Sequence, residues 1–569
     1  MRRVAVAGLI CLAVPLAAQD KPADEAPSAR VDKVFEAYDH TNGPGCSVAV
    51  VKDGRIAYER GYGMADLDHG VVNTPSTVFH VASVSKQFTA AAIVLLAQQG
   101  KLSLDDDVRK HLPQVPDFGA TITLRNLIHH TSGLRDQWDL LGLAGWRYSL
   151  DLITDQDVMD MVSRQKELNF RPGEKHVYCN TGYTLLGQVV KAVSGKSLRE
   201  FTTENIFRPL GMSSTHFRDD HAEVVPNQAL GYEPEGSRFR LGLTNFDTVG
   251  ATSLLTTVED LARWDQNFYE PKVGGPALVS QILEPGRLAS GKPLTYAFGL
   301  ALGKYKGLPT VDHGGADAGY RSDLIRFPEQ RFSVAVLCNT TANAGQLAKN
   351  VADVYLAGSF SPEAAKTDAA IALPEEKLKD KAGFYWSHET DRTLEVELKD
   401  GKLAVVADEE RLEAEPLSET RFRLTAFPVT FEVQPGEHAS RPKLCLVQDD
   451  PECFDPAEKF QPSAAELRQY AGTYFSDEVE AFYRVVDEGG KLTLTRLRHK
   501  PQELKPQVRD LFTGDIRVRF VRDGKGEVTG LLAGTDRARN VRFRRLPAGA
   551  RPPATGDGAR ARRGAAKGE

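Results

Sequence analysis

The spacing of apolar and polar residues divides the chain into regions of different character. From Val31 to Leu356, helical patterns of apolar residues alternate with short β-rich runs. Residues 358–377 are rich in proline and alanine, which is typical of a linker. After this segment the pattern changes to short alternating strands separated by turn residues. The pattern therefore predicts an α+β domain over residues 31–357, followed by an all-β region.

Three segments of the first domain show these patterns most clearly. A helical run that opens at residues 81–86 stops at Gly100, and a second run, from Thr181 to Val193, ends at Gly195. Glycine directly after the last apolar position is a common helix end. Residues 320–327 are expected to form a strand.

The all-β region contains an internal repeat. Eight residues recur at a constant offset of 89 positions, namely Leu378, Ala382, Gly383, Tyr385, Ser387, Gly401, Lys402 and Leu403, which match Leu467, Ala471, Gly472, Tyr474, Ser476, Gly490, Lys491 and Leu492. Phe431 and Phe520 extend the same register. Two copies are too few for a solenoid, whereas all-β segments of this size suit small barrels or sandwiches. We expect two small all-β barrel-like modules, at residues 378–462 and 463–546, whose usual role is scaffolding.

The two ends of the chain differ from the folded regions. Two arginines precede an apolar run that ends at Ala18, which is the order of a secretory signal peptide over residues 1–18. An uncleaved signal anchor is the alternative. A polar linker follows at residues 19–30, and the Pro-, Gly- and Arg-rich tail, residues 547–569, is expected to be disordered. The protein is therefore predicted to be exported, to the periplasm or the extracellular space.

Length, composition and charge narrow the class of protein. A chain of 569 residues corresponds to about three or four domains. Hydrophobic residues at 41% and charged residues at 26% are typical of folded soluble proteins. The 71 basic and 77 acidic residues give a net charge of −6, which argues against a nucleic-acid partner. No apolar run after the signal peptide is long enough to span a membrane.

Cysteine is expected to be incidental to the fold. Of six cysteines, Cys11 lies in the predicted signal peptide, and the odd number that is left requires at least one free thiol. No Cys-x-x-Cys spacing exists to hold zinc. Cys445 and Cys453 are close enough to close a small loop, but two separate thiols are equally compatible with the sequence.

The first candidate motif is Ser83 with Lys86. Near the start of a helix, a lysine three residues after a serine lies on the same face, so that its amine can reach the hydroxyl. An amine whose pKa is lowered by burial can take the serine proton and make the oxygen a nucleophile. The alternative is an ordinary polar helix start formed by Ser85 and Lys86.

The second and third motifs contain groups that suit substrate binding and proton transfer. Tyr178 and Asn180 are two residues apart in an extended segment, so both can face one cavity. The alternative is that Asn180 caps the next helix and Tyr178 is merely buried. In the run His313, Gly314, Gly315 and Ala316, the glycines allow a substrate to approach the strand, and the histidine adds a polar group.

The order of these motifs resembles that of the penicillin-recognising serine hydrolases. This family includes class C β-lactamases, D,D-carboxypeptidases, esterases and D-aminopeptidases. The resemblance covers residues 31–356 and includes the stretch from Leu127 to Leu134. It implies an antiparallel sheet flanked by helices, with the active site between the sheet and a helical subdomain. No metal or organic cofactor is implied.

The resemblance also assigns roles to the matching positions. By this likeness, Ser83 is the acylated nucleophile, Lys86 activates it, and Tyr178 is the general base and acid. Asn180 would orient the substrate, His313 and Gly315 would line the strand edge, and the N–H groups of Ser83 and Ala316 would form the oxyanion hole.

One departure from the family pattern bears on the substrate. β-Lactamases usually have Lys-Thr-Gly at the third motif, where this chain has His313, Gly314 and Gly315. A histidine there, and two β modules after the catalytic domain, look like D-aminopeptidases. We therefore expect a serine hydrolase that acts on small peptide, amide or ester substrates, with a D-amino-acid peptidase favoured. A carboxylesterase, a weak β-lactamase and a non-catalytic envelope binding protein are the alternatives, and the oligomeric state is left open.

Two further segments allow more than one interpretation. Residues 138–148 include two tryptophans and three leucines, and they form either an apolar flap over the site or helix-packing core. A metal site is a weaker hypothesis for four residues that lie close together in sequence, namely His216, Asp219, Asp220 and His221.

Overall fold

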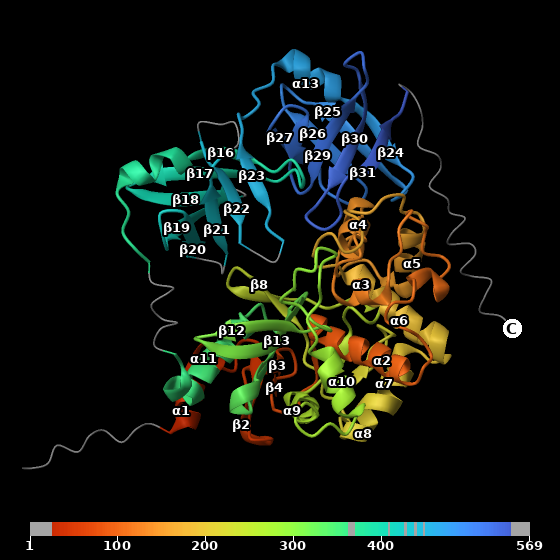
Figure 1. Ribbon diagram of the computed structural model, residues 1–569, viewed down its shortest axis with the longest axis vertical. Helices are drawn as coiled ribbons and strands as arrows, with labels where there is room; N and C mark the ends of the chain where they lie inside the picture. Colours follow the sequence, from red (N-terminus) through yellow and green to blue (C-terminus); the bar gives the residue numbers. More distant parts are fainter. Residues whose placement is uncertain are drawn as a thin grey trace, which may run out of the picture.

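A computed structural model describes residues 26–361, 370–407, 410–425, 429–436, 441–447 and 450–547, and Figure 1 shows how they are arranged. The predicted signal peptide and the tail beyond residue 547 lie outside the described residues, as do most of the first linker and part of the second. No helix in the described part of the chain combines the length and the apolarity that crossing a bilayer requires.

An antiparallel sheet of six strands forms the centre of the first domain. Its strands, in spatial order, are β12 (Ala301–Tyr305), β13 (Leu308–Asp317), β14 (Tyr320–Phe327), β15 (Phe332–Cys338), β1 (Cys46–Lys52) and β2 (Arg55–Tyr62). The strand predicted at residues 320–327 is β14 with the same bounds. Because β1 lies between β15 and β2, the first and last strands of the domain meet in the middle of the sheet.

Helices cover both faces of this sheet. One face packs against α1 (Pro27–Val34) and α11 (Ala344–Leu356), and their apolar residues form one core with the outward side chains of the strands. The other face packs against α9 (Val258–Gln266) and the helical subdomain (Figure 1).

Helix α1 starts at Pro27, so the linker predicted at residues 19–30 is wrong for its last residues. Val31 is fully buried against α11, which explains why this segment is ordered.

The helical subdomain lies beside the sheet, as expected. Its helices are α2 (Lys86–Gln98), α3 (Leu124–Ile128), α4 (Gln137–Leu143), α5 (Asp155–Ser163), α6 (Asn180–Ser194), α7 (Leu198–Thr202), α8 (Arg208–Leu210) and α10 (Gly275–Ile282). Short strands connect it to the rest of the domain, namely β3 (Met64–Asp66), β4 (Val71–Val72), β5 (Phe79–His80), β6 (Ile153–Thr154), β7 (His216–Phe217), β8 (Tyr232–Glu235), β9 (Arg238–Leu241), β10 (Phe246–Asp247) and β11 (Leu254–Thr256). Helices α2 and α6 pack against each other and bring the first two motifs together. Gly100 and Gly195 both have positive φ at the helix ends where they were predicted.

The repeated region forms two closed barrels of eight antiparallel strands each. Barrel 1 consists of β16 (Gly383–Trp386), β17 (Thr393–Lys399), β18 (Lys402–Ala407), β19 (Glu410–Pro416), β20 (Arg421–Leu424), β21 (Thr430–Gln434), β22 (Lys443–Leu446) and β23 (Cys453–Pro456). Barrel 2 follows α13 (Ala464–Tyr470) and consists of β24 (Gly472–Ser476), β25 (Ala481–Asp487), β26 (Leu492–Arg496), β27 (Gln502–Pro506), β28 (Leu511–Thr513), β29 (Arg517–Arg522), β30 (Val528–Gly534) and β31 (Val541–Arg545). The expected barrel-like modules are confirmed.

Several of the repeated residues are core positions of the barrels, whereas the repeated Gly-Lys pairs, residues 401–402 and 490–491, are exposed. Tyr385 and Tyr474 are fully buried, and each hydroxyl donates a hydrogen bond to the carbonyl oxygen four residues earlier, at 2.8 and 2.7 Å. The phenol thus satisfies its one polar group while its ring fills the barrel. Leu403 and Leu492 are buried in the same two cores.

The expectation that cysteine is incidental to the fold is wrong. Cys46 and Cys338 form a disulfide between β1 and β15, and Cys445 and Cys453 form a second one between β22 and β23. In each disulfide the two cysteines lie opposite each other in neighbouring strands. The loop considered for Cys445 and Cys453 is therefore closed, whereas the pairing of Cys46 with Cys338 could not be seen from their positions 292 residues apart. The odd number of cysteines requires a free thiol, and among the described residues this is Cys179, which is buried.

Candidate active site

The predicted site residues gather around one cavity of about 1060 Å³ between β13 and the helical subdomain. Seven of the eight line it, namely Ser83, Tyr178, Asn180, His313, Gly314, Gly315 and Ala316. The eighth, Lys86, is fully buried behind Ser83. Residues from three distant parts of the chain thus meet as the sequence predicts.

Ser83 and Lys86 form the centre of the site. Ser83 lies in the 3-10 turn η2 (Ala82–Ser85), directly before α2. The Lys86 amine donates three hydrogen bonds, to Ser83 Oγ at 3.0 Å, Asn180 Oδ1 at 2.8 Å and the Ala251 carbonyl oxygen at 2.7 Å. Burial lowers the pKa of Lys86 to about 7. Near neutral pH a large fraction of this amine is therefore uncharged and able to accept a proton.

The alternative of an ordinary polar helix start is wrong. Ser85 is buried, and its hydroxyl donates to the Ala82 carbonyl oxygen at 2.5 Å and accepts from the Leu254 N–H at 3.0 Å. Ser85 therefore fixes the turn, whereas Ser83 faces the cavity.

The phenol of Tyr178 lies against both residues of the first motif. The Lys86 nitrogen lies 4.9 Å from the centre of its ring, and its hydroxyl interacts with the Ser83 side chain. Burial raises the pKa of Tyr178, and the interaction with Ser83 offsets only part of the shift. At neutral pH the hydroxyl is therefore protonated and can donate a proton.

Asn180 is the first residue of α6, but its side chain does not cap that helix. Its Oδ1 accepts from Lys86, and its Nδ2 donates to Asp136 Oδ2 at 2.9 Å. The same carboxylate oxygen accepts the Asn180 backbone N–H at 2.6 Å. Asp136, which the sequence analysis missed, therefore holds Asn180 at two points.

His313 is uncharged in this environment. Burial, followed by the charge of Lys86, lowers the pKa of His313 to about 4. Its Nδ1 lies 2.7 Å from the Gly314 carbonyl oxygen, which only accepts hydrogen bonds, so the proton is on Nδ1 and Nε2 accepts from the Tyr296 hydroxyl at 3.0 Å. The histidine therefore gives the site a neutral ring at this position.

The strand beside the motifs has an open edge. Strand β12 pairs with residues 308–312 of β13, so the backbone from His313 to Asp317 has a partner strand, β14, on one side only. At Gly315 a Cβ atom would lie 2.3 Å from the Val81 carbonyl oxygen, so glycine is needed for the strand to approach the η2 turn. This contact brings the open edge beside Ser83.

Both interpretations of residues 138–148 hold, for different side chains. Leu140, Leu141 and Leu143 are buried in the core, while Trp138 and Tyr148 line the cavity with their ring centres 5.3 Å apart.

Tyr148 also donates a hydrogen bond to Asp317, a cavity residue that the sequence analysis missed. Asp317 accepts further hydrogen bonds from His80 and Thr252. Burial raises the pKa of Asp317, but these three hydrogen bonds outweigh burial and hold the pKa below its usual value. Asp317 is therefore ionised at the end of the open edge.

A loop of barrel 2, residues 535–540, reaches the cavity. Arg537 lines it, and its guanidinium nitrogens lie 3.8 Å from Asp136 Oδ2 and 3.4 Å from Asp139 Oδ1. The Arg537 carbonyl oxygen accepts the Asp136 N–H at 2.9 Å. Through Asp136, barrel 2 is connected to Asn180.

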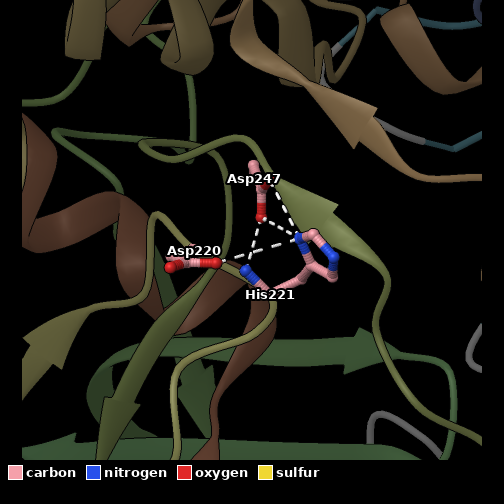
Figure 2. Close-up of side chains that lie close together, drawn as sticks. All are labelled: Asp220, His221 and Asp247. Carbon is pink, nitrogen blue, oxygen red and sulfur yellow. Dashed lines mark hydrogen bonds and ion pairs between the residues drawn. The ribbon is translucent and has the colours of Figure 1, made fainter. Parts of the chain in front are cut away.

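The four residues of the metal hypothesis do not converge. His221 Nδ1 lies 3.0 Å from Asp247 Oδ1, with Asp220 4.0 Å away, as Figure 2 shows. His216 and Asp219 turn instead toward Glu223 and Arg199. Asp220, His221 and Asp247 instead form a hydrogen-bonded group near the surface whose possible ligand atoms lie within 4.8 Å of one another, and none of the three lines the cavity.

Comparisons with known proteins agree with this geometry. The beta-lactamase family model matches residues 31–357. D-aminopeptidases from Brucella anthropi and Brucella canis are each 28% identical to the chain, over 89% of this chain and 96% of theirs. The fold is similar to that of an octameric penicillin-binding protein homologue from Pyrococcus abyssi, with a TM-score of 0.53 and 23% identity over 75% of this chain and 99% of that one.

Proposed function

Because the chain belongs to the beta-lactamase family, we propose that it is a serine hydrolase that cleaves amide bonds through an acyl-enzyme on Ser83. The observation that supports this most directly is the contact between Ser83 Oγ and the buried Lys86 amine at 3.0 Å. Folding does not require a buried amine with a pKa of about 7 beside a hydroxyl. Acyl transfer by a serine needs a base next to its hydroxyl, and this amine can serve as that base.

In the proposed reaction, Ser83 Oγ attacks the substrate carbonyl carbon while neutral Lys86 accepts the hydroxyl proton. Tyr178, whose phenol is protonated, gives its proton to the nitrogen of the leaving group and regains one from Lys86. The C–N bond breaks, the amine departs and an ester remains on Ser83. Water then attacks that ester, its proton returns along the same path to Ser83 Oγ, and the acid product leaves.

The open edge of β13 supports the predicted oxyanion hole. The N–H groups of Ser83 and Ala316 are the candidate donors for the negative charge that develops on the carbonyl oxygen. Donors of this kind contribute about 10²- to 10³-fold in rate each. Hydrogen bonds with Asp136 and Lys86 fix the orientation of the Asn180 side chain, which can then contact the substrate.

The preference for substrates built on D-amino acids rests on two observations. The D-aminopeptidase relatives align over nearly the whole chain, including the region of both barrels. In addition, His313 is neutral and Gly314 has no hydroxyl, so this motif lacks the charge and the donor typical of β-lactamases.

We also propose that the protein is exported. The signal-peptide pattern of residues 1–18 is the main support. The two disulfides add to it, because disulfides persist in oxidising compartments outside the cytoplasm.

Intact-mass measurement tests the acyl-enzyme. The protein is mixed with a fluorophosphonate and, separately, with D-alanine p-nitroanilide. We expect one adduct per chain with the fluorophosphonate, release of p-nitroaniline, and neither result for Ser83→Ala. Full labelling of Ser83→Ala would show that another residue is the nucleophile.

A carboxylesterase is the second candidate, favoured by the aromatic wall of Trp138 and Tyr148 beside the site. Turnover of p-nitrophenyl butyrate without any turnover of D-alanine p-nitroanilide would support the esterase over the peptidase.

A further inference from the structure

His130 is a buried histidine beside the active site that the proposed reaction does not use. It lies in the turn directly after α3, is 1% exposed and does not line the cavity. Its Nε2 atom is buried and has no hydrogen-bond partner among the described residues. A buried polar atom without a partner destabilises a fold, so packing alone does not explain a histidine at this position.

His130 forms hydrogen bonds with the residues on both sides of Tyr178. Residues 175–179 form neither a helix nor a strand, so no ladder of backbone hydrogen bonds fixes this segment. Instead, the Val177 N–H donates to the His130 carbonyl oxygen and the Cys179 N–H donates to His130 Nδ1, both at 3.0 Å. A single residue therefore holds the backbone before and after the phenol.

The His130 ring also packs against the Tyr178 ring. The two ring centres are 4.2 Å apart, and their planes differ by 36°. The rings of Tyr183 and Tyr296 lie on other sides of His130, with centres 5.2 and 4.7 Å away. Tyr178 thus rests on a ring that other aromatic side chains hold in place.

The turn that contains His130 is fixed to two helices. The Thr131 N–H donates to the Asn126 carbonyl oxygen of α3 at 2.9 Å. The Tyr183 hydroxyl of α6 donates to the Ile128 carbonyl oxygen, also in α3, at 2.8 Å. The position of His130, and through it that of Tyr178, is therefore set by the packing of α3 and α6.

The hydrogen bond from Cys179 requires a neutral His130. Nδ1 accepts an N–H and therefore carries no proton of its own. Burial, followed by the charges of His176 and Lys86, lowers the pKa of His130 well below its usual value. At pH 7 the ring is therefore neutral, with its proton on Nε2, and Nδ1 can accept.

Tyr178 has to lie close to Ser83 and to the leaving nitrogen to pass on its proton, and a displacement of about 1 Å can cost about 100-fold in rate. We propose that His130 is a positioning residue for Tyr178, which it fixes through two backbone hydrogen bonds and one ring contact, and that it serves the step in which the leaving amine is protonated. This inference rests on the proposed function, because His130 acts through the proton donor of that reaction.

The test compares two substrates that share an acyl group and differ in the leaving group. The amine of D-alanine p-nitroanilide has to be protonated to leave, whereas D-alanine p-nitrophenyl ester releases a phenolate that leaves as an anion. We expect His130→Phe, which keeps a ring but removes the acceptor, to lower kcat/KM by about 10- to 100-fold for the anilide and by less than about threefold for the ester. Equal losses on both substrates would overturn the inference.

The ratio of the two kcat/KM values separates positioning from damage to the fold. Both substrates are assayed on one sample, so the ratio does not depend on the fraction of protein that is folded. If His130→Phe does not fold, His130→Ala takes its place, since it removes the ring and the acceptor without adding bulk. It should lower the ratio at least as far.

A rescue variant and a matched control accompany this measurement. His130→Asn offers an acceptor oxygen in place of Nδ1, and asparagine tolerates the φ of 56° at this residue, so this variant should recover most of the anilide activity. The control is His129→Phe. His129 is also buried, but its ring packs against Phe298 with centres 4.9 Å apart, and the substitution should leave the anilide-to-ester ratio unchanged.

A double-mutant cycle shows whether His130 acts through Tyr178. Tyr178→Phe removes the proton donor, so adding His130→Phe to it should lower kcat/KM for the anilide by less than about a further twofold. Losses that multiply would show that His130 acts on another part of the protein and would overturn the inference.

Hydrogen exchange separates the failure of this inference from the failure of the proposed function. Mass spectrometry of peptides that cover residues 175–180 should show faster exchange of the Cys179 amide in His130→Phe than in wild type and His130→Asn, because the acceptor is gone. Unchanged exchange would overturn the inference and leave the acyl-enzyme on Ser83 unaffected. A wild type without a fluorophosphonate adduct would overturn the proposed function, while faster exchange would still show that His130 fixes the segment of Tyr178.

Discussion

The two barrels share one repeated pattern but differ at one hairpin. In barrel 1 the hairpin between β22 and β23 is closed by the Cys445–Cys453 disulfide. In barrel 2 the corresponding hairpin, between β30 and β31, has no cysteine, and its residues 535–540 reach the cavity. The cores of the two barrels are alike, so the difference in role comes from a loop that the shared fold does not constrain.

The barrels also differ in how they attach to the first domain. Barrel 2 lies beside α4 (Figure 1). The apolar core of barrel 2 is continuous with that of the helical subdomain, and the Tyr483 hydroxyl donates to the Leu143 carbonyl oxygen on α4 at 2.9 Å. The core of barrel 1 is separate, and it contacts the first domain through polar groups such as the Lys175–Glu389 ion pair. Barrel 2 is therefore packed as part of the catalytic unit.

The largest effect is expected from the buried ion pair that attaches barrel 2. Arg135, in the helical subdomain, lies 2.6 Å from Glu478 of barrel 2, and both side chains are almost completely buried. Arg135→Ala leaves the Glu478 charge without its partner and should cost about 3–5 kcal/mol of unfolding free energy. Chemical denaturation monitored by tryptophan fluorescence checks this. The control is Lys175→Ala, which breaks the half-exposed pair with barrel 1 and should cost less than about 1 kcal/mol.

The disulfide hairpin of barrel 1 should affect stability but not catalysis. Replacing Cys445 and Cys453 by serine releases a small loop and should lower the stability of barrel 1 by about 2–3 kcal/mol. The value of kcat/KM at 25 °C should stay unchanged, because none of the described residues of this hairpin lines the cavity. A large loss of activity in a folded double variant would contradict the separation of the two barrels.

Removing the Arg537 side chain, which barrel 2 contributes to the cavity, should lower kcat/KM clearly while changing the unfolding free energy little. Arg537→Ala takes away the cation beside Asp136, which positions Asn180, and we expect kcat/KM to fall by about tenfold, or 1.4 kcal/mol. Arg537→Lys keeps the charge and should recover part of the activity. Wild-type kcat/KM in Arg537→Ala would show that barrel 2 is only a scaffold.

The smallest expected effect is a shift in the pH profile. Lys86 must be neutral to accept the Ser83 proton, so kcat/KM should rise with pH through about 7. The positive charge of Arg537 lowers the pKa of Lys86, so Arg537→Ala should move this rise to higher pH. Profiles of the two proteins between pH 5 and 9 check the direction of the shift. The Cys445 and Cys453 double variant is the matched control and should keep the wild-type profile.

Much of the site was predictable because each motif is local. Ser83 and Lys86 are three residues apart on one turn, and the strand after His313 was bounded correctly from its pattern. The predicted roles of these residues are still predictions, although the structure brings the residues together.

The missed residues depend on contacts between distant parts of the chain. Asp136 has the signal of a helix cap, but its hydrogen bond to Asn180, 44 positions later, and its contact with Arg537, about 400 positions later, follow from tertiary packing. Asp323 is the one acid of β14, a strand of mixed polar and apolar residues, and only the register opposite Gly314 reveals it as part of the cavity. Hydrophobic periodicity contains no information of this kind.

The Cys46–Cys338 bond turns most of the first domain into a covalent ring. All eight predicted site residues lie within it, between the two linked positions. A protease that cuts any loop inside this ring once leaves two fragments that are still joined. The nicked protein should migrate as one species until a reductant is added. The two fragments that carry the active-site residues should therefore stay covalently joined after the cut.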